Sequence, residues 1–255
     1  MTNSAPRGGL ATSKQFGPHT THILTKGSTM LKHSLIGATL IASAALAAPA
    51  SAQDWYGSAF LGYSYADDLD YSGTIGAGPQ TVETDLDESA SFGITIGREF
   101  GSIGGNASLR GEIELSYRSN DVTAVDFSGN GAGNEANPGG DISSTFLLAN
   151  AIVDFDTGSA FTPYVGAGIG VGFIEQNVIY GPTSNVTIRG DDEAFTAQLI
   201  AGASYEISET TSLFGDVRYA RSYDVTGTRT SPAGVATVSD DLSSTSVNFG
   251  VRFKF

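Results

Sequence analysis

The sequence predicts an all-β fold: an eight-stranded antiparallel up-and-down transmembrane β-barrel. Three observations lead to this prediction. Apolar and polar residues alternate in eight segments between Trp55 and Phe255, the connections between these segments are alternately long and short, and the segment that ends the chain keeps this alternation over eleven residues. Alternation with a period of two is the pattern of a strand that has one apolar face.

The last segment, Thr245–Phe255, defines the two faces most clearly. Phe249, Val251, Phe253 and Phe255 share its apolar face, and the basic residues fall on the other face. An aromatic strand left at a sheet edge invites aggregation, but in a closed barrel the last strand pairs with the first. These four residues resemble the C-terminal assembly signal of bacterial outer-membrane proteins, which implies the outer-membrane assembly machinery as a partner.

The first 52 residues contain no acidic residue and all three histidines of the chain. Residues 30–52 combine a short basic start, an apolar run rich in Ala and Leu, and a small-residue cleavage pattern just before Gln53. This order is typical of a secretory signal peptide, and the run is shorter than the about 18 apolar residues of a membrane-spanning helix. We therefore interpret residues 30–52 as a signal peptide, residues 1–29 as a dispensable or non-native leader, and residues 53–255 as the barrel.

The composition of the barrel part excludes several classes of function. It carries nine basic and 27 acidic residues, a formal charge of −18, and no Cys, His or Met. Such acidity excludes nucleic acid as a partner, because phosphate contacts need a basic surface. The missing histidine argues against an enzyme, because a Ser nucleophile needs a base and only carboxylate pairs remain. We also predict no cofactor, because the alternating glycines from Gly166 to Gly172 lie within a strand and not at a dinucleotide-binding turn.

Each predicted strand has apolar residues at every second position. The third is the cleanest, because it alternates Leu, Gly, Ile, Leu and Tyr with Arg, Glu, Glu, Ser and Arg. In chain order the predicted strands are Trp55–Tyr65, a strand that carries Phe92, Ile94 and Ile96 and ends at Phe100, Leu109–Arg118, about 144–155, Pro163–Phe173, Phe195–Tyr205, a strand that contains Leu213–Tyr219, and Thr245–Phe255.

The connections predict where each end of the barrel lies. Short turns are expected at 101–106, 156–162 and 208–211, on the side that holds both termini, and loops of about 20 residues on the other side, which is the arrangement of outer-membrane barrels. The prediction is therefore a monomer in the outer membrane of a Gram-negative bacterium, surrounded by membrane lipid and lipopolysaccharide.

The apolar face of the strands is expected to face lipid. Glycine weakens a strand on a solvated outer face, whereas inside a narrow barrel it makes room for long Arg and Glu side chains. Aromatic residues also collect at both ends of the apolar face, as in the girdles of a membrane barrel. One predicted rim consists of Trp55, Phe100, Phe155, Tyr205, Phe253 and Phe255, and the other of Tyr63, Tyr65, Tyr117, Phe173, Phe195 and Tyr219.

The polar face then lines the lumen with charges of both signs. Unpaired charges in so narrow a lumen are costly, so balanced charges indicate mutual pairing and a lumen plugged by salt bridges. The alternative is that the same residues line a narrow porin-like diffusion channel for small solutes. The predicted lumen network consists of Arg110, Glu112, Glu114, Arg118, Asp154, Glu206, Asp216, Arg218 and Arg252.

The motifs LRGEIELSYR, FTPYVGAGIGVG and the terminal VRFKF together resemble the small outer-membrane β-barrels of Gram-negative bacteria, the opacity-protein and OmpA/OmpX-like group. The resemblance covers the chain from Trp55 to Phe255 and is specific for the fold more than for an activity. It implies a role in envelope integrity or adhesion, or the porin label that members often carry, and it brings no catalytic residues.

The long loops are expected to be acidic and extracellular. They are interpreted as solvated, variable surface loops, which are also the expected place for an extracellular ligand. The sharper alternative is capture of Ca²⁺ or Mg²⁺, because these cations prefer carboxylate oxygens, although no EF-hand spacing is present. The candidate ligands are Asp67, Asp68, Asp70, Asp191, Asp192 and Glu193.

Overall fold

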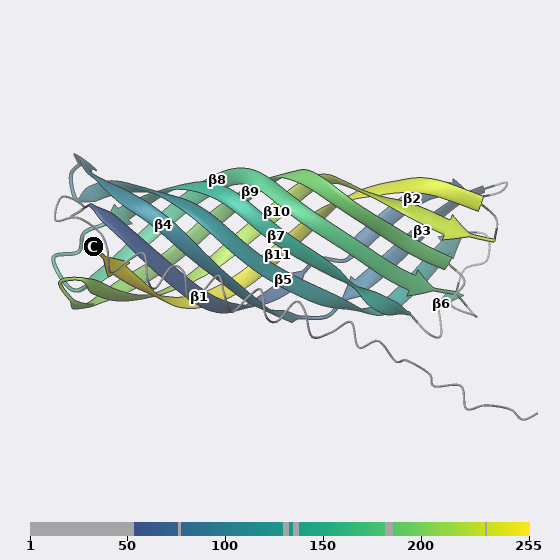
Figure 1. Ribbon diagram of the computed structural model, residues 1–255, viewed down its shortest axis with the longest axis horizontal. Coiled ribbons are helices and arrows are strands. Elements are labelled where there is room, and N and C mark those ends of the chain that lie inside the picture. The colour runs from purple at the N-terminus through teal and green to yellow at the C-terminus, as the bar shows by residue number, and fades with distance from the viewer. Residues whose placement is uncertain (1–53, 76–77, 130–132, 135–137, 182–185, 233) are drawn as a thin grey trace, which may run out of the picture. The chain divides into compact units, whose positions relative to one another are not determined.

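In the computed structural model, antiparallel strands pair edge to edge around a closed ring (Figure 1). The structure describes residues 54–75, 78–129, 133–134, 138–181, 186–232 and 234–255, all within one compact unit that spans Ala45–Phe255. The predicted leader and signal peptide lie outside the described residues. None of the described residues belongs to a helix long and apolar enough to cross a membrane.

The described part of the chain forms eleven strands. They are β1 (Trp55–Ala66), β2 (Leu69–Ile75), β3 (Gly78–Leu86), β4 (Ser89–Gly104), β5 (Ala107–Gly129), β6 (Gly133–Asn134), β7 (Gly139–Phe155), β8 (Phe161–Tyr180), β9 (Val186–Ser208), β10 (Thr211–Ser231) and β11 (Gly234–Lys254).

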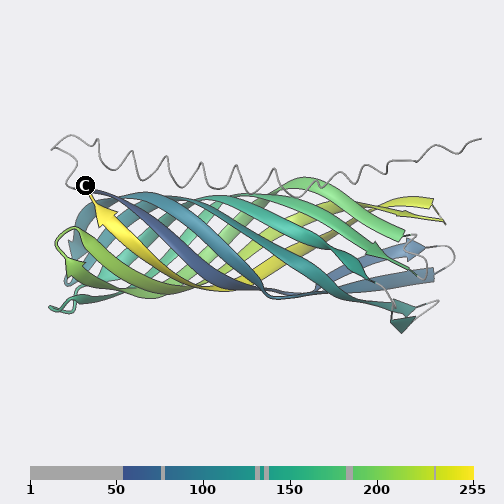
Figure 2. The same ribbon diagram turned by 60° about the horizontal axis from the view of Figure 1, so that its bottom comes forward.

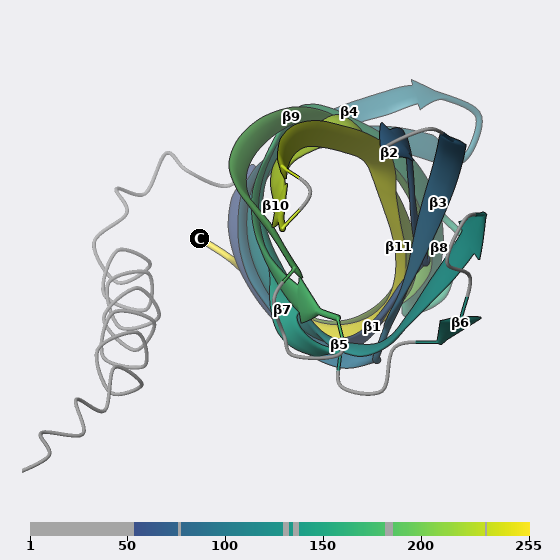
Figure 3. The ribbon, with the colours of Figure 1, turned by 90° about the vertical axis from the view of Figure 1, so that its right-hand side faces the viewer.

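Eight of these described strands close the ring, which Figure 3 shows end-on. The first and last strands meet, because β1 pairs with β11 on one edge and with β4 on the other. β5 then pairs with β4 and β7, and β8, β9 and β10 complete the circuit back to β11. Every pairing is antiparallel, so the prediction of an all-β, up-and-down barrel is confirmed.

The alternation in the sequence becomes an alternation of burial. In β10 successive residues are exposed and buried almost without a break, and the large apolar side chains are on the exposed side. Trp55 and Tyr65 stand near the two ends of β1, both about 40% exposed or more. This spacing suits the about 9–11 residues that a tilted strand needs to span a bilayer.

The strands are longer than the alternation predicts, and the expectation of loops of about 20 residues is wrong. β5 and β9 each contain 23 residues and β10 and β11 each contain 21, about twice what a membrane crossing requires. The outward apolar signal ends at the second aromatic rim, because the strand faces water beyond it. Backbone pairing nevertheless continues, as it does between Val186 of β9 and Tyr180 of β8.

Beyond that rim the sheet divides in two. β5 leaves β7 after Asp121 and pairs with β3, so that β2, β3, β6 and the end of β5 form a separate small sheet. We call this region, made of segments 66–90, 119–143, 174–194 and 220–244, the distal part. Its inner side is an apolar core in which Leu69, Val82, Val122 and Val125 pack with Ile142, Phe146, Leu148, Ile174, Val178, Tyr180, Ile188, Ala194, Val225, Val238 and Leu242.

Glycines in the lumen wall make room for aromatic side chains. The sequence had led us to expect Arg and Glu side chains beside these glycines. A Cβ atom on Gly93 would overlap the ring of Phe60, and one on Gly97 would overlap the ring of Tyr56. The rings project from β1 and lie against the neighbouring strand β4. Arginines then stack on the rings, so the glycines support the charged residues through an aromatic layer.

Candidate functional site

The charged residues of the lumen form two ion clusters on the inner wall of the membrane-spanning ring. The first is centred on Arg110 of β5, whose Nε donates to Asp154 Oδ2 at 2.7 Å. Its Nη1 donates to Glu112, two residues along the same strand, and Tyr56 donates its hydroxyl to Glu112 Oε1 at 2.9 Å. Arg110 and Glu112 are both buried. One guanidinium therefore neutralises carboxylates from two adjacent strands.

The second cluster is centred on Arg218 of β10. Its Nε donates to Asp216 Oδ1 and its Nη2 donates to Asp216 Oδ2, both at 2.9 Å. Its Nη1 lies 2.7 Å from Glu114 Oε2 across the lumen. Glu114 also accepts hydrogen bonds from the amides of Asn150 at 2.9 Å and Gln198 at 2.7 Å. Charge-assisted bonds of this kind are about twice as strong as neutral ones. The cluster thus links strands β5, β7, β9 and β10.

Two further buried arginines in the membrane-spanning ring, Arg118 and Arg252, have no carboxylate partner among the described residues. Arg118 donates to Ser244 Oγ at 2.5 Å, and its guanidinium lies 4.5 Å from the centre of the Phe146 ring. The guanidinium of Arg252 lies 5.0 Å from the Tyr56 ring and 5.6 Å from the Phe214 ring. Both cations are held by aromatic faces, an attraction that strengthens when the cation is desolvated.

Glu206 was expected in this network but is exposed. It lies near the end of β9, where the pairing with β10 shifts register between Thr211 and Ser212, and its backbone N–H donates to the carbonyl of Ala160. The wall of the barrel ends there, so the Glu206 side chain reaches water even though the strand alternation directs it inward. The other eight residues of the predicted network line the lumen, where all but Asp154 are buried.

The neutral partners of these charges were not predicted from the sequence. Tyr164 of β8 donates its hydroxyl to Asp216 Oδ2 at 3.0 Å, and Asn248 of β11 donates to Asp216 Oδ1 at 3.0 Å. Phe60 lies under the Arg218 guanidinium at 4.2 Å. The alternation along each strand could have identified Tyr164, Asn248 and Phe60, because each occupies an inward position opposite a glycine of a neighbouring strand.

The lumen holds apolar side chains beside its charged ones. The small space among Arg110, Arg218 and Arg252 does not admit a water molecule. Two apolar side chains of β7, Phe146 and Leu148, lie 2% and 1% exposed and join the apolar core described above. Leu148 is paired with Glu114, so charged and apolar side chains lie side by side in the lumen.

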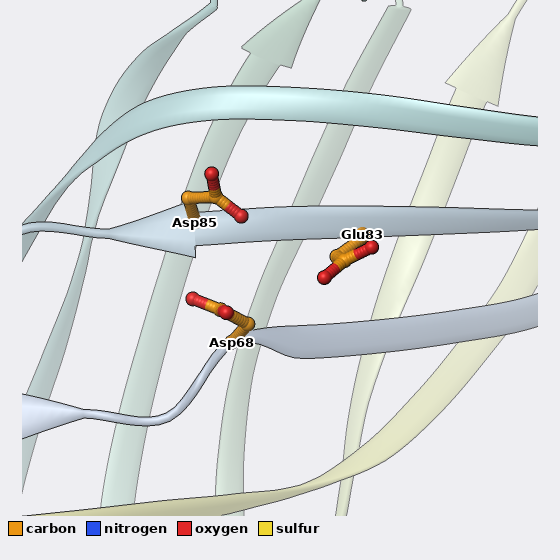
Figure 4. Close-up of side chains that lie close together, drawn as sticks. All are labelled: Asp68, Glu83 and Asp85. Carbon is orange, nitrogen blue, oxygen red and sulfur yellow. The ribbon is translucent and has the colours of Figure 1, made fainter.

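Three of the acidic residues beyond the second rim converge. Asp68, Glu83 and Asp85 each place one carboxylate oxygen within 4.8 Å of the others (Figure 4). Burial and repulsion from Asp85 raise the pKa of Asp68, and repulsion chiefly from Asp70 raises the pKa of Glu83. Oxygen ligands in this arrangement suit a hard cation such as Ca²⁺.

The other predicted cation ligands are not part of this group. Asp192 lies in β9, and its Oδ2 accepts the backbone N–H of Thr226 at 2.7 Å, where the pairing of β10 with β9 is interrupted. Asp191 and Glu193 flank it in the same strand. Asp67 lies between β1 and β2, where its N–H donates to the Ser243 carbonyl, and Asp70 is the second residue of β2. The expected acidic loops are therefore largely strand.

A family model described as the outer membrane protein β-barrel domain matches residues 36–255. No curated protein matches the chain.

Solved structures of several outer-membrane proteins are similar to this one. The outer-membrane protease OmpT from Escherichia coli is 8% identical with a TM-score of 0.53, over 80% of this chain and 98% of OmpT. The outer membrane protein OprG from Pseudomonas aeruginosa is 16% identical with a TM-score of 0.51, over 80% of this chain and 97% of OprG. Neisserial surface protein A is 20% identical with a TM-score of 0.45, over 79% of this chain and 97% of that protein. At these identities OmpT and OprG establish a shared fold.

Proposed function

Because the chain belongs to the family of outer-membrane protein β-barrel domains, we propose that it is a structural or adhesive surface barrel whose lumen is closed. It is located in the outer membrane, with the distal part outside the cell. The observation that carries the proposal is the buried ion network, in which Arg110 and Arg218 connect four carboxylates from β5, β7 and β10. Such a network fixes the wall of the barrel and occupies its interior.

The proposed role does not include catalysis. The described residues include no histidine, and the buried carboxylates already accept hydrogen bonds from arginine, tyrosine and amide groups. A general base must reach a proton on a substrate, and these carboxylates are closed off within the wall. The protease relative OmpT shares the fold at 8% identity, which does not transfer an activity.

The proposed surroundings are membrane lipid and lipopolysaccharide around a monomeric barrel. Exposed Leu61, Ile96, Leu199 and Phe249 lie outward on strands of the ring and would contact acyl chains. The terminal strand, which β1 and β10 both pair with, is the part that the assembly machinery would recognise. The distal part is the surface offered to an extracellular partner.

A comparison of cells that contain or lack the protein tests this function. A structural barrel predicts that its loss makes the envelope more sensitive to detergent and more permeable to a large dye, while uptake of small solutes is unchanged. Production of the wild-type chain should restore the barrier, and so should a variant with Asp67→Asn, which changes only an exposed charge. Slower uptake of small solutes with an intact barrier would favour the narrow channel and contradict the proposal.

A further inference from the structure

Two strand edges in the distal part have no backbone partner among the residues that the structure describes. β1 pairs with β11 as far as Ala66 and Ser244, and β2, which continues outward from β1, pairs only with β3 among the described strands. On the other side, β11 pairs with β10 from Gly234 inward. The β2–β3 and β10–β11 hairpins both end at the side of the barrel opposite the C-terminus, as separate tips (Figure 2). Among the described residues the distal part is therefore open along a seam between β2 and β11, although the ring below it is closed.

The pairing pattern identifies which backbone groups face the seam. In an antiparallel pair, alternate residues direct both N–H and C=O toward the partner, and the residues between them direct both away. The Ser243 carbonyl accepts from Asp67 and so points away from β10. Counting outward from Ser243 in steps of two, Val235, Thr237 and Ser239 also turn their backbone groups away from β10.

A carboxylate already bridges the inner end of the seam. Asp240 Oδ2 accepts the backbone N–H of Asp70 at 2.7 Å, and its Oδ1 accepts the N–H of Asp241 at 2.8 Å. These two donors lie on opposite edges, so a side chain satisfies groups that a neighbouring strand would otherwise satisfy. Farther out no described strand pairs with this edge of β11, and Val235, an apolar residue well beyond the aromatic rims, is 70% exposed.

The charge of the distal part selects the kind of partner. Its four segments contain 18 acidic and three basic residues, and Asp70 and Asp240 stand at the seam itself, whereas the Asp241 carboxylate is paired with Arg221 of β10. This field repels a second copy of the chain and attracts a cation. An unpaired strand edge recognises an extended backbone, whose hydrogen bonds supply affinity while side chains supply specificity.

We infer that the outer edge of β11 at Val235–Ser239 binds an extended, positively charged peptide segment as an added strand. The added backbone would satisfy the groups of Val235, Thr237 and Ser239, and its Lys or Arg side chains would meet the seam carboxylates. The inference rests on the proposed surface role only for placing this edge outside the cell. It does not depend on a closed lumen, and its failure would leave that part of the proposal unaffected.

The test uses the full barrel, refolded in detergent micelles, and a ten-residue peptide of alternating Lys and Thr. Binding should be measurable at low ionic strength and should slow amide hydrogen exchange at Val235, Thr237 and Ser239. The same peptide with every second backbone nitrogen methylated keeps its charge but loses its strand-forming donors, and should bind at least about tenfold more weakly. A peptide with Glu in place of Lys should not bind.

A pair of variants at one position separates backbone recognition from charge. Thr237→Pro removes a seam-facing N–H that β10 does not use, so β10–β11 pairing is kept, whereas Thr237→Ala keeps that N–H. Peptide affinity should fall roughly tenfold in the first and stay unchanged in the second. Equal binding of the methylated and unmethylated peptides would overturn the inference without any variant, and so would unchanged affinity in a folded Thr237→Pro barrel.

Discussion

Glu112 accepts hydrogen bonds from two buried groups inside the barrel. Its carboxylate receives the Tyr56 hydroxyl and Arg110 Nη1, and it is 6% exposed. Removing one member of a buried ion pair leaves the other charge uncompensated, which costs about 3–5 kcal/mol, less where water can enter. Arg110 keeps Asp154 as a partner, so we expect the lower end of that range.

Glu112→Ala should therefore lower the temperature at which the barrel loses its fast-migrating form on unheated gels. Glu99→Ala is the matched control, because Glu99 pairs with Lys254 at 3.0 Å on the surface, with its side chain 40% exposed. Surface pairs contribute about 0–1 kcal/mol, so this variant should migrate like the wild type. Equal effects of the two substitutions would show that the lumen pairs are no more stabilising than surface pairs.

Gly93 leaves no space for a side chain. The ring of Phe60 fills the space that a Cβ atom on Gly93 would occupy, and this ring lies under the Arg218 guanidinium. Gly93→Ala should destabilise the barrel by about 1–3 kcal/mol, the usual cost of overpacking a filled interior. Gly139→Ala adds the same methyl group where no atom lies within 4 Å, and its effect on the unfolding midpoint in denaturant should be small. A tolerated Gly93→Ala would mean that the ring moves freely.

Glu83 belongs to a group of like charges, and its titration should be visible in stability. Repulsion, first from Asp70, raises the pKa of Glu83 in the folded barrel. The folded state then binds the proton more tightly than the unfolded state, so stability is highest below the ordinary pKa of about 4.3 and falls as pH rises through the raised value. Glu83→Gln should raise the midpoint of heat denaturation at pH 7, and this gain should disappear near pH 3. A gain that persists at low pH would exclude charge repulsion as its cause.

The alternation of apolar and polar residues predicted the strands of the ring but not how far they extend beyond the membrane. The membrane-spanning halves of β1, β8 and β11 were predictable because lipid requires an apolar outer face, which gives a strong period of two. The distal halves have polar residues outside and an apolar core inside, interrupted by glycine and acidic residues. Their pairing depends on partners that are distant in sequence, such as Thr84 of β3 beside Val125 of β5.

The charged residues that line the lumen could be predicted from the sequence, but the ion pairs that they form could not. Parity placed Arg110, Glu114 and Arg218 inside, whereas the partner of each depends on register across the ring. Glu114 and Arg218 meet across the lumen from strands that are not neighbours, and no local pattern records that contact. The exposure of Glu206 likewise follows from where the wall ends, which parity does not indicate.

The last strand should be the element on which assembly depends most. β11 pairs with β10 along nearly its whole length and closes the ring against β1, while Phe249 and Phe253 remain exposed on its outer face. Substitution of Phe255 by Ser, or its deletion, should lower the amount of folded barrel in the outer membrane while secretion across the inner membrane continues. Val235→Ser, in the distal half of the same strand, should leave the amount unchanged. Equal amounts of folded protein after loss of Phe255 would contradict its part in the assembly signal.

In the molecule as a whole, apolar, paired charged and acidic residues occupy three different environments. Apolar side chains face outward between the aromatic rims, paired charges and rings fill the ring, and carboxylates gather on the distal part. The ring is closed by backbone pairing around its full circumference, and its interior holds the ion clusters together with buried apolar side chains. We propose that this lumen is a closed support for the distal surface.

Single-channel recording on the purified barrel in planar bilayers tests that claim most directly. The wild-type protein, verified as folded by its migration on unheated gels, should give no large, steady conductance. A variant with Arg218→Ala and Glu114→Ala in the ion network and Phe146→Ala and Leu148→Ala in the apolar core should conduct if it remains folded, because it removes both the charged and the apolar side chains that fill this part of the lumen. Silent wild-type barrels and a conducting variant are the predicted result. A stable open channel in wild-type barrels, at the nanosiemens level, would contradict it.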